Sequence, residues 1–271
     1  MESCRLVELE HWFEEYAGRF FGPDEYVNRH LRLKQEHTRR VREEILHLAG
    51  RLALDDDQTR IAETVALLHD VGRFPQFVRH RTFSDLRSVN HACLAIEVLH
   101  QEGVLDALAS EERLWIETAV ALHSCRLIPA GLDGPALLFL KLIRDADKLD
   151  IYRIMTDIYR RYRENAPGLS FDAELPNEPR VTPEVVDTVL AGRLVEHASL
   201  RTLNDMRLCQ IGWVYDINFT AGLERLQAGG WLEQLFADLP DSDEMQRVRR
   251  KILGYVESRL AAVSGPGGRD S

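Results

Sequence analysis

Apolar residues recur at helical spacing over most of this chain of 271 residues, and no segment alternates apolar and polar residues as a half-buried strand does. Positions three, four and seven apart share one face of an α-helix, so each segment has one face to bury. The pattern predicts an all-α protein folded as a helical bundle. We expect helices over residues 6–20, 24–48, 57–71, 90–101, 110–125 and 136–163, and further helices from 183 to about 260.

Three stretches interrupt this pattern. Residues 74–89 are rich in arginine and have no clear period, whereas residues 165–183 hold four prolines and are expected to form a loop or a lid. The tail, residues 263–271, is expected to be disordered. No linker separates two cores, so the sequence predicts a single domain over residues 1–262 with extra C-terminal helices over about 182–262.

Charge and hydropathy exclude several classes of protein. The formal net charge of −10 argues against a nucleic-acid or anionic-membrane surface, which needs an excess of lysine and arginine. No apolar run reaches the roughly 18–20 residues of a membrane span, and the N-terminus has no signal-peptide core. The 4 cysteines are widely spaced, as reduced thiols of a cytoplasmic protein would be. A small phosphorylated partner needs only a local basic patch, and homo-oligomer formation is left open.

Six titratable residues lie on the apolar side of their own predicted helices, where a charge is costly unless it is paired or bound to a metal. His37, for example, shares its face with Leu33, Val41 and Ile45. The six are His37, His69, Asp70, His91, His123 and Asp147.

The choice of the distant carboxylate has an alternative. Asp147 shares a face with Leu140, Ile143 and other apolar residues. Asp145 also lies on a partly apolar face, but two lysines share that face. Asp147 is therefore the preferred ligand, and Asp145 is the alternative.

Each of these residues has a simpler interpretation by itself. A lone histidine on an apolar stripe is more often a hydrogen-bonded core residue, and a buried aspartate is more often the partner of an arginine. Four inward imidazoles and two carboxylates on five helices favour a metal site instead, because a bundle core can bring them together. The remaining histidines are interpreted as structural or surface residues: His11, His30, His47, His80, His100 and His197.

At these positions the chain resembles the HD superfamily of metal-dependent phosphohydrolases, whose signature is a histidine, a His-Asp pair and a distant aspartate. The matching elements are His37, the pair in ALLHDVGRF, and Asp147 in ADKLD. His91 and His123 resemble the additional ligands of the binuclear HD-GYP phosphodiesterases, although PAGLDGP stands where the GYP motif would be. Further stretches resemble a group of bacterial HD proteins: HDVGRFPQF, RTFSD, SVNH, LFLKLIRDADKLDIYR and WVYDINF.

The resemblance implies an HD-domain helical bundle with a metal-binding core over about residues 30–160. One divalent ion is expected on His37, His69, Asp70 and Asp147, and a second on His91 and His123. Asp70 would bridge the two ions. A set rich in histidine suits Mn, Fe, Zn or Ni better than Mg. Two ions roughly 3.5–4 Å apart can hold a hydroxide that attacks a phosphoester.

Basic residues near these ligands are candidate phosphate contacts. Arg73 follows the His-Asp pair by one turn, and Lys148 adjoins Asp147, so both are predicted to act on the substrate together with Asp70. The other basic residues of 79–87 are interpreted as a solvated loop. The GWVYDINF stretch is interpreted as core packing, with a pocket wall as the alternative.

The sequence thus predicts an enzyme that hydrolyses a small phosphomonoester or phosphodiester, a nucleotide being one candidate. Two alternatives stay open. Some HD-fold proteins similar to myo-inositol oxygenase use the same ligand set to hold two irons for oxidation. A non-catalytic nucleotide-sensing module could also retain the metal core. The neighbouring arginine and lysine favour the phosphohydrolase.

Overall fold

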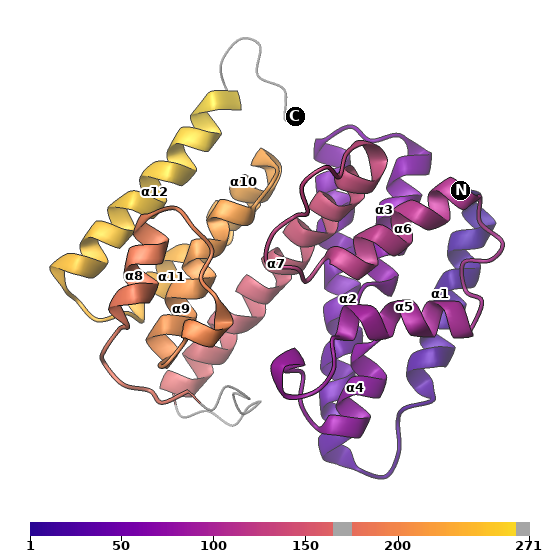
Figure 1. Cartoon of the computed structure of the whole chain (residues 1–271), viewed down its shortest axis with the longest axis horizontal. Helices are drawn as coiled ribbons and strands as arrows, with labels where there is room; N and C mark the ends of the chain where they lie inside the picture. The colour runs from indigo at the N-terminus through magenta and orange to yellow at the C-terminus, as the bar shows by residue number, and fades with distance from the viewer. Residues whose placement is uncertain (165–174, 264–271) are drawn as a thin grey trace. The chain divides into compact units, whose positions relative to one another are not determined.

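The computed structural model describes residues 1–164 and 175–263, and every regular element in those two ranges is a helix (Figure 1). The all-α prediction is therefore confirmed. The chain divides into two compact units, Met1–Asp147 and Lys148–Ser271. Their border falls inside the longest helix, α7 (Gly134–Arg163). The predicted single domain over 1–262, with a core over about 30–160, stays a prediction.

The first unit is organised around α3, which packs against α1, α2 and α6. Most side chains of α3 are buried, including Ile61, Val65 and Leu68. Helix α4 contacts α2 and α5, and α5 pairs with α6. The C-terminal end of α3 therefore lies inside the unit. The helices are α1 (Ser3–Gly18), α2 (Glu25–Arg51), α3 (Asp56–Leu68), α4 (Arg73–His80), α5 (His91–Gln101) and α6 (Ser110–Leu122).

Side-chain caps fix where two of these helices begin. Asp55 and Gln58 form a reciprocal capping box at the start of α3. The side chain of Asn90, the predicted N-cap, accepts a hydrogen bond from the Cys93 amide at 2.9 Å. That cap makes His91 the first residue of α5.

The segment expected to be irregular contains most of helix α4, so that prediction is wrong for residues 74–80. Helix α4 has barely two turns, too few for a clear period, but its buried face holds Phe74, Gln76 and Phe77. The preceding helix ends at Leu68, three residues earlier than expected. Of the expected loop over 165–183, residues 165–174 lie outside the described part, and α8 begins at Pro183, as predicted. The tail from residue 264 also lies outside it.

The second unit is built around α9, whose residues are almost all buried. Helix α9 contacts α8 and α11, and α12 contacts α8 and α10. The Tyr152 hydroxyl donates to the Gln210 carbonyl at 2.6 Å, which ties the later part of α7 to α9. The helices are α8 (Pro183–Leu190), α9 (Leu203–Gly212), α10 (Thr220–Ala228), α11 (Trp231–Ala237) and α12 (Asp243–Val263).

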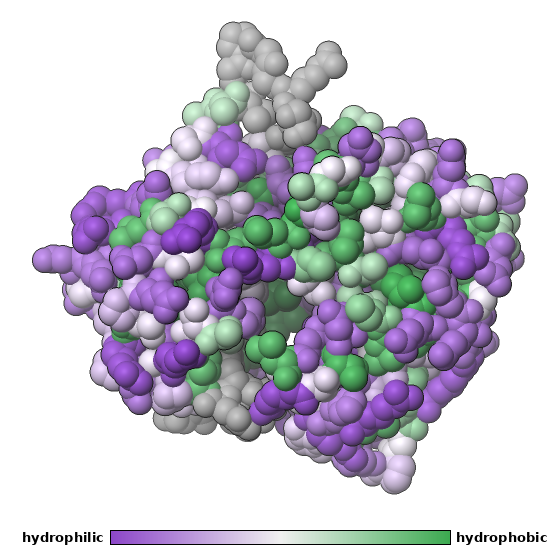
Figure 2. All heavy atoms as spheres, in the orientation of Figure 1, coloured by the Kyte–Doolittle hydropathy of each residue, from purple (hydrophilic) through white to green (hydrophobic). Residues whose placement is uncertain are grey.

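Hydrophilic and hydrophobic side chains both reach the surface, as the face drawn in Figure 2 shows. Exposed large apolar side chains include Leu86, Leu114 and Leu127. Among the helices that the structure describes, none combines the length and the apolar character that crossing a membrane requires.

Candidate metal centre

The six predicted ligands all belong to the first unit and come from five helices or their ends. His37 lies in the middle of α2, and His69 and Asp70 follow directly after α3. Five of the six are buried, with no more than 5% of the residue exposed: His37, His69, Asp70, His91 and His123. The side chain of Asp147, on α7, is 19% exposed.

The Asp70 carboxylate lies between two pairs of imidazoles. Its Oδ2 atom is 3.5 Å from His37 Nε2 and 3.7 Å from His69 Nε2. Its Oδ1 atom is 3.4 Å from His91 Nε2 and 4.0 Å from His123 Nε2. Each oxygen faces one pair, so the His37, His69, Asp70 group and the Asp70, His91, His123 group could each hold an ion.

A close approach of backbone brings His91 to this carboxylate. A Cβ at Gly72 would lie 2.2 Å from the His91 carbonyl oxygen and 2.7 Å from the Ala95 nitrogen. Only glycine leaves room for α5 to approach the turn after α3 so closely. Gly72 therefore lets His91 lie beside the His69–Asp70 pair.

The distant carboxylate joins the group through His37. Asp147 Oδ1 is 3.1 Å from His37 Nε2. Burial by itself would raise the pKa of Asp147, but the hydrogen bond and charge of His37 outweigh it and hold that pKa well below its usual range. Asp145 is fully buried and, two positions away, projects from a different side of α7.

His69 and His123 each use Nδ1 for a hydrogen bond to the backbone and present Nε2 to the Asp70 carboxylate. His69 Nδ1 lies 2.8 Å from the Ala66 carbonyl oxygen, and His123 Nδ1 lies 2.8 Å from the Val120 carbonyl oxygen. A carbonyl accepts only, so each Nδ1 carries the proton and each Nε2 keeps its lone pair. This second hydrogen bond is typical of metal-binding histidines.

The Nε2 lone pairs of His69, His91 and His123 are arranged in a way that fits a cation. Burial lowers the pKa of His123 and, together with the charge of Arg73, that of His91, each to about 4, so both rings are neutral at pH 7. Their Nε2 atoms nevertheless lie 3.0 Å apart. His69 Nε2 is buried without a hydrogen-bond partner among the described residues. Opposed lone pairs and an unpartnered buried nitrogen fit divalent ions.

Two cations contact the same carboxylate. Lys34 Nζ is 2.7 Å from Asp70 Oδ2, and Arg73 Nε is 3.4 Å from Asp70 Oδ1. Burial would raise the pKa of Asp70, but the charge of Lys34, with the neighbouring imidazoles and Arg73, holds it well below its usual range. Both cations also pack against the Phe83 ring, at 5.3 and 6.0 Å from its centroid. Our sequence analysis missed Lys34, although it lies one turn before His37 on the same face of α2.

The predicted substrate contact Arg73 is bonded within the protein. Its Nη1 atom donates to Gln76 Oε1 at 2.9 Å, to the Phe83 carbonyl at 2.6 Å and to Asp85 Oδ1 at 2.9 Å. Sequence analysis also missed Asp85 and Gln76, because the stretch that holds them has no helical period to reveal which side chains turn inward. The phosphate contact of Arg73 stays a prediction.

Lys148 belongs to the second unit by its contacts. Its Nζ atom pairs with Asp216 Oδ2 at 2.7 Å, and both side chains are largely buried. Asp216 comes from the GWVYDINF stretch, so this stretch places one charged side chain against α7. The predicted role of Lys148 toward phosphate stays a prediction.

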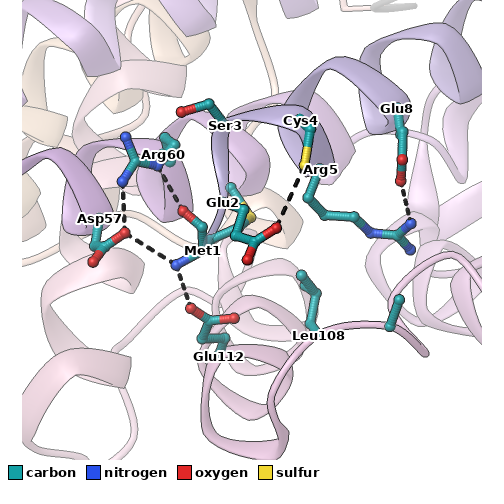
Figure 3. Close-up of a pocket in the computed structure, with 11 residues that line it drawn as sticks. Met1, Glu2, Ser3, Cys4, Arg5, Glu8, Asp57, Arg60, Leu108 and Glu112 are labelled. Carbon is teal, nitrogen blue, oxygen red and sulfur yellow. Dashed lines mark hydrogen bonds and ion pairs between the residues drawn. The ribbon is translucent and has the colours of Figure 1, made fainter.

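A separate pocket of about 890 Å³ lies between the N-terminal residues, α3 and α6 (Figure 3). Figure 3 shows the Met1 amine between Asp57 and Glu112, at 3.1 and 2.5 Å. Arg60 contacts both Met1 and Asp57. None of the predicted ligands lines this pocket.

Comparison with known proteins agrees with this geometry. The HD domain family matches residues 35–152, a range that contains all six predicted ligands. No curated protein and no solved structure matches the chain. The family match and the buried His/Asp groups together show that residues 35–152 form an HD domain.

Proposed function

We propose that this protein is a metal-dependent phosphohydrolase that acts on a small phosphomonoester or phosphodiester. The observation that carries the proposal is the Asp70 carboxylate, with one imidazole pair facing each oxygen and Lys34 and Arg73 at its edge. HD domains are typical of metal-dependent hydrolases. A nucleotide is one candidate substrate.

The ligand residues divide into two sets. His37, His69 and Asp147 would hold one ion with Asp70 Oδ2, and the other two histidines would hold a second with Oδ1. Bound divalent ions supply Lewis acidity, which lowers the pKa of water and neutralises phosphoryl oxygens. Manganese, iron, zinc or nickel suits these imidazoles better than magnesium does.

Lys34 is the residue that we propose for contact with the substrate phosphate. Its ammonium group already binds an anionic oxygen at the centre, and its side chain is 16% exposed. A lysine acts on phosphate as a compact point charge, so it can bind the carboxylate and a phosphoryl oxygen together. Arg73 contacts Asp70 and Asp85. Its Nη1 atom already has three protein acceptors, so it would have to give one of them up to contact phosphate.

A screen of phosphorylated metabolites, with Mn, Fe, Co, Ni or Mg added to metal-free protein, tests the proposal. We expect hydrolysis that depends on the added metal and that His37→Ala abolishes. His47→Ala is the matched control, because His47 lies exposed on the same helix and should leave the activity unchanged. Metal binding without hydrolysis of any phosphoester would contradict the proposed activity. Iron-dependent oxygen consumption would indicate the di-iron alternative.

A further inference from the structure

His91 differs from His69 and His123 in the group that its Nδ1 atom contacts. His69 and His123 each bond to the carbonyl three residues earlier in their own helix. His91 is the first residue of α5, so no preceding helical turn offers it such a carbonyl. Its Nδ1 atom instead lies 2.7 Å from Oδ2 of Asp85. The carboxylate accepts, so His91 Nδ1 carries the proton and Nε2 faces Asp70 with a lone pair.

Asp85 is itself held in one orientation by two donors on its other oxygen. Asp85 Oδ1 accepts from Arg73 Nη1 at 2.9 Å and from Gln76 Nε2 at 2.8 Å. Gln76 is fully buried. Its amide also donates to Ser88 Oγ and to the Val89 carbonyl, both at 2.9 Å. One amide on α4 therefore fixes the segment that carries Asp85, including the short helix η1 (Asp85–Arg87).

We propose that Asp85 is a positioning residue that fixes the protonated nitrogen of His91 and thereby completes the Asp70, His91, His123 metal site. This inference depends on the proposed function at one point only, namely that the Asp70, His91, His123 group binds an ion. A hydrogen bond of this kind orients the ring and raises the basicity of the ligating nitrogen, and its loss typically weakens metal binding by about 10–100-fold.

The two donors on Oδ1 make Asp85→Asn an informative substitution. Arg73 and Gln76 both donate, so the asparagine oxygen must face them and its NH₂ group must face His91. His91 Nδ1 then has to accept, and the proton moves to Nε2. That proton would point at His123 Nε2, now 3.0 Å away, and would remove His91 as a ligand. Asp85→Ala removes the acceptor without this inversion, so it should be the milder variant.

The direct test is nitrogen-15 NMR of the histidine rings in metal-free protein, which needs neither substrate nor ion. We expect the Nδ1–H form of His91 in the wild type and the Nε2–H form in Asp85→Asn. Leu86→Ala is the matched control, because Leu86 is 79% exposed in the same short helix and should change nothing. If Asp85→Asn does not fold, the wild-type spectrum decides: an Nε2–H form there would overturn the proposal.

Calorimetric titration with Mn²⁺ then measures the consequence for binding. We expect Asp85→Ala to weaken binding of the ion held by His91 and His123 by about 10–100-fold, and Asp85→Asn, like His91→Ala, to abolish it. Wild-type Mn²⁺ affinity in Asp85→Asn, or an unchanged Nδ1–H form, would overturn the proposal. An inverted ring form in a protein that hydrolyses no phosphoester would leave this proposal standing and remove the proposed function.

Discussion

Each unit buries an aspartate, and the two aspartates have opposite surroundings. Asp205 in the second unit is fully buried, and its oxygens accept from the Thr182 amide and hydroxyl and from the amides of Arg201 and Thr202, all within 3.0 Å. Asp70 in the first unit accepts from Lys34 and lies 3.4 Å from Arg73 Nε, and it faces four imidazole nitrogens at 3.4–4.0 Å. A carboxylate saturated by backbone donors holds a fold together, whereas one surrounded by lone pairs is suited to a cation.

The largest effect is expected at the carboxylate that both ligand groups share. Asp70→Ala removes an oxygen from each group, so metal binding should be lost and phosphohydrolase activity should fall by roughly 10³-fold or more. The fold should persist, because four imidazoles relieved of a buried charge still pack in the core. Metal analysis tests the expected loss of the ions, and a thermal melt tests whether the fold persists. An Asp70→Ala protein that retains its metal would show that Asp70, like Asp205, is not needed for metal binding.

Asp205→Ala should produce the reverse result. It leaves the donors of Thr182, Arg201 and Thr202 without their acceptor inside the second unit, which costs about 3 kcal/mol of unfolding free energy. Urea denaturation measures the loss. Metal content of the folded fraction should match the wild type, and a selective loss of metal with unchanged stability would contradict the structural role.

A smaller effect is expected for Lys34→Met, which removes the ammonium group but keeps the length of the side chain. We expect kcat/KM to fall by about 10–100-fold at unchanged metal content, because the charge on a phosphoryl oxygen is lost while all the imidazoles stay. Arg32→Ala serves as the control, since Arg32 lies on the same helix in an ion pair with Glu25 at the surface. Equal kinetics for wild type and Lys34→Met would remove Lys34 from the proposed site.

The smallest effect is expected at Arg81, a basic residue of the first unit that lies away from the centre. It pairs with Asp24 at 2.7 Å, and the two side chains are 50% and 47% exposed. Such a surface pair contributes little, so Arg81→Ala should change stability by less than about 0.5 kcal/mol and activity by less than about twofold. A large loss of activity in parallel enzyme assays would show that substrate reaches farther along this segment than proposed.

Helical periodicity determines which parts of the fold and of the candidate site could be predicted from the sequence. His37 and His123 were recognisable because the apolar residues on their faces repeat at helical spacing, and the all-α fold follows from the same signal. The same spacing would also have found Lys34, one turn before His37. It could not have found Asp85, because residues 81–90 have no period, nor the pairing of Lys148 with Asp216, which depends on tertiary contacts.

The central claim is that the imidazoles around Asp70 meet to hold divalent ions. Anomalous X-ray diffraction from crystals grown with Mn²⁺ tests it directly, because the signal locates the ion without reference to activity. We predict a manganese peak bonded to Asp70 and to the Nε2 atoms of the facing histidines, and no such peak in Asp70→Ala. A wild-type map without manganese at Asp70, with Lys34 still bound to its carboxylate, would contradict the claim.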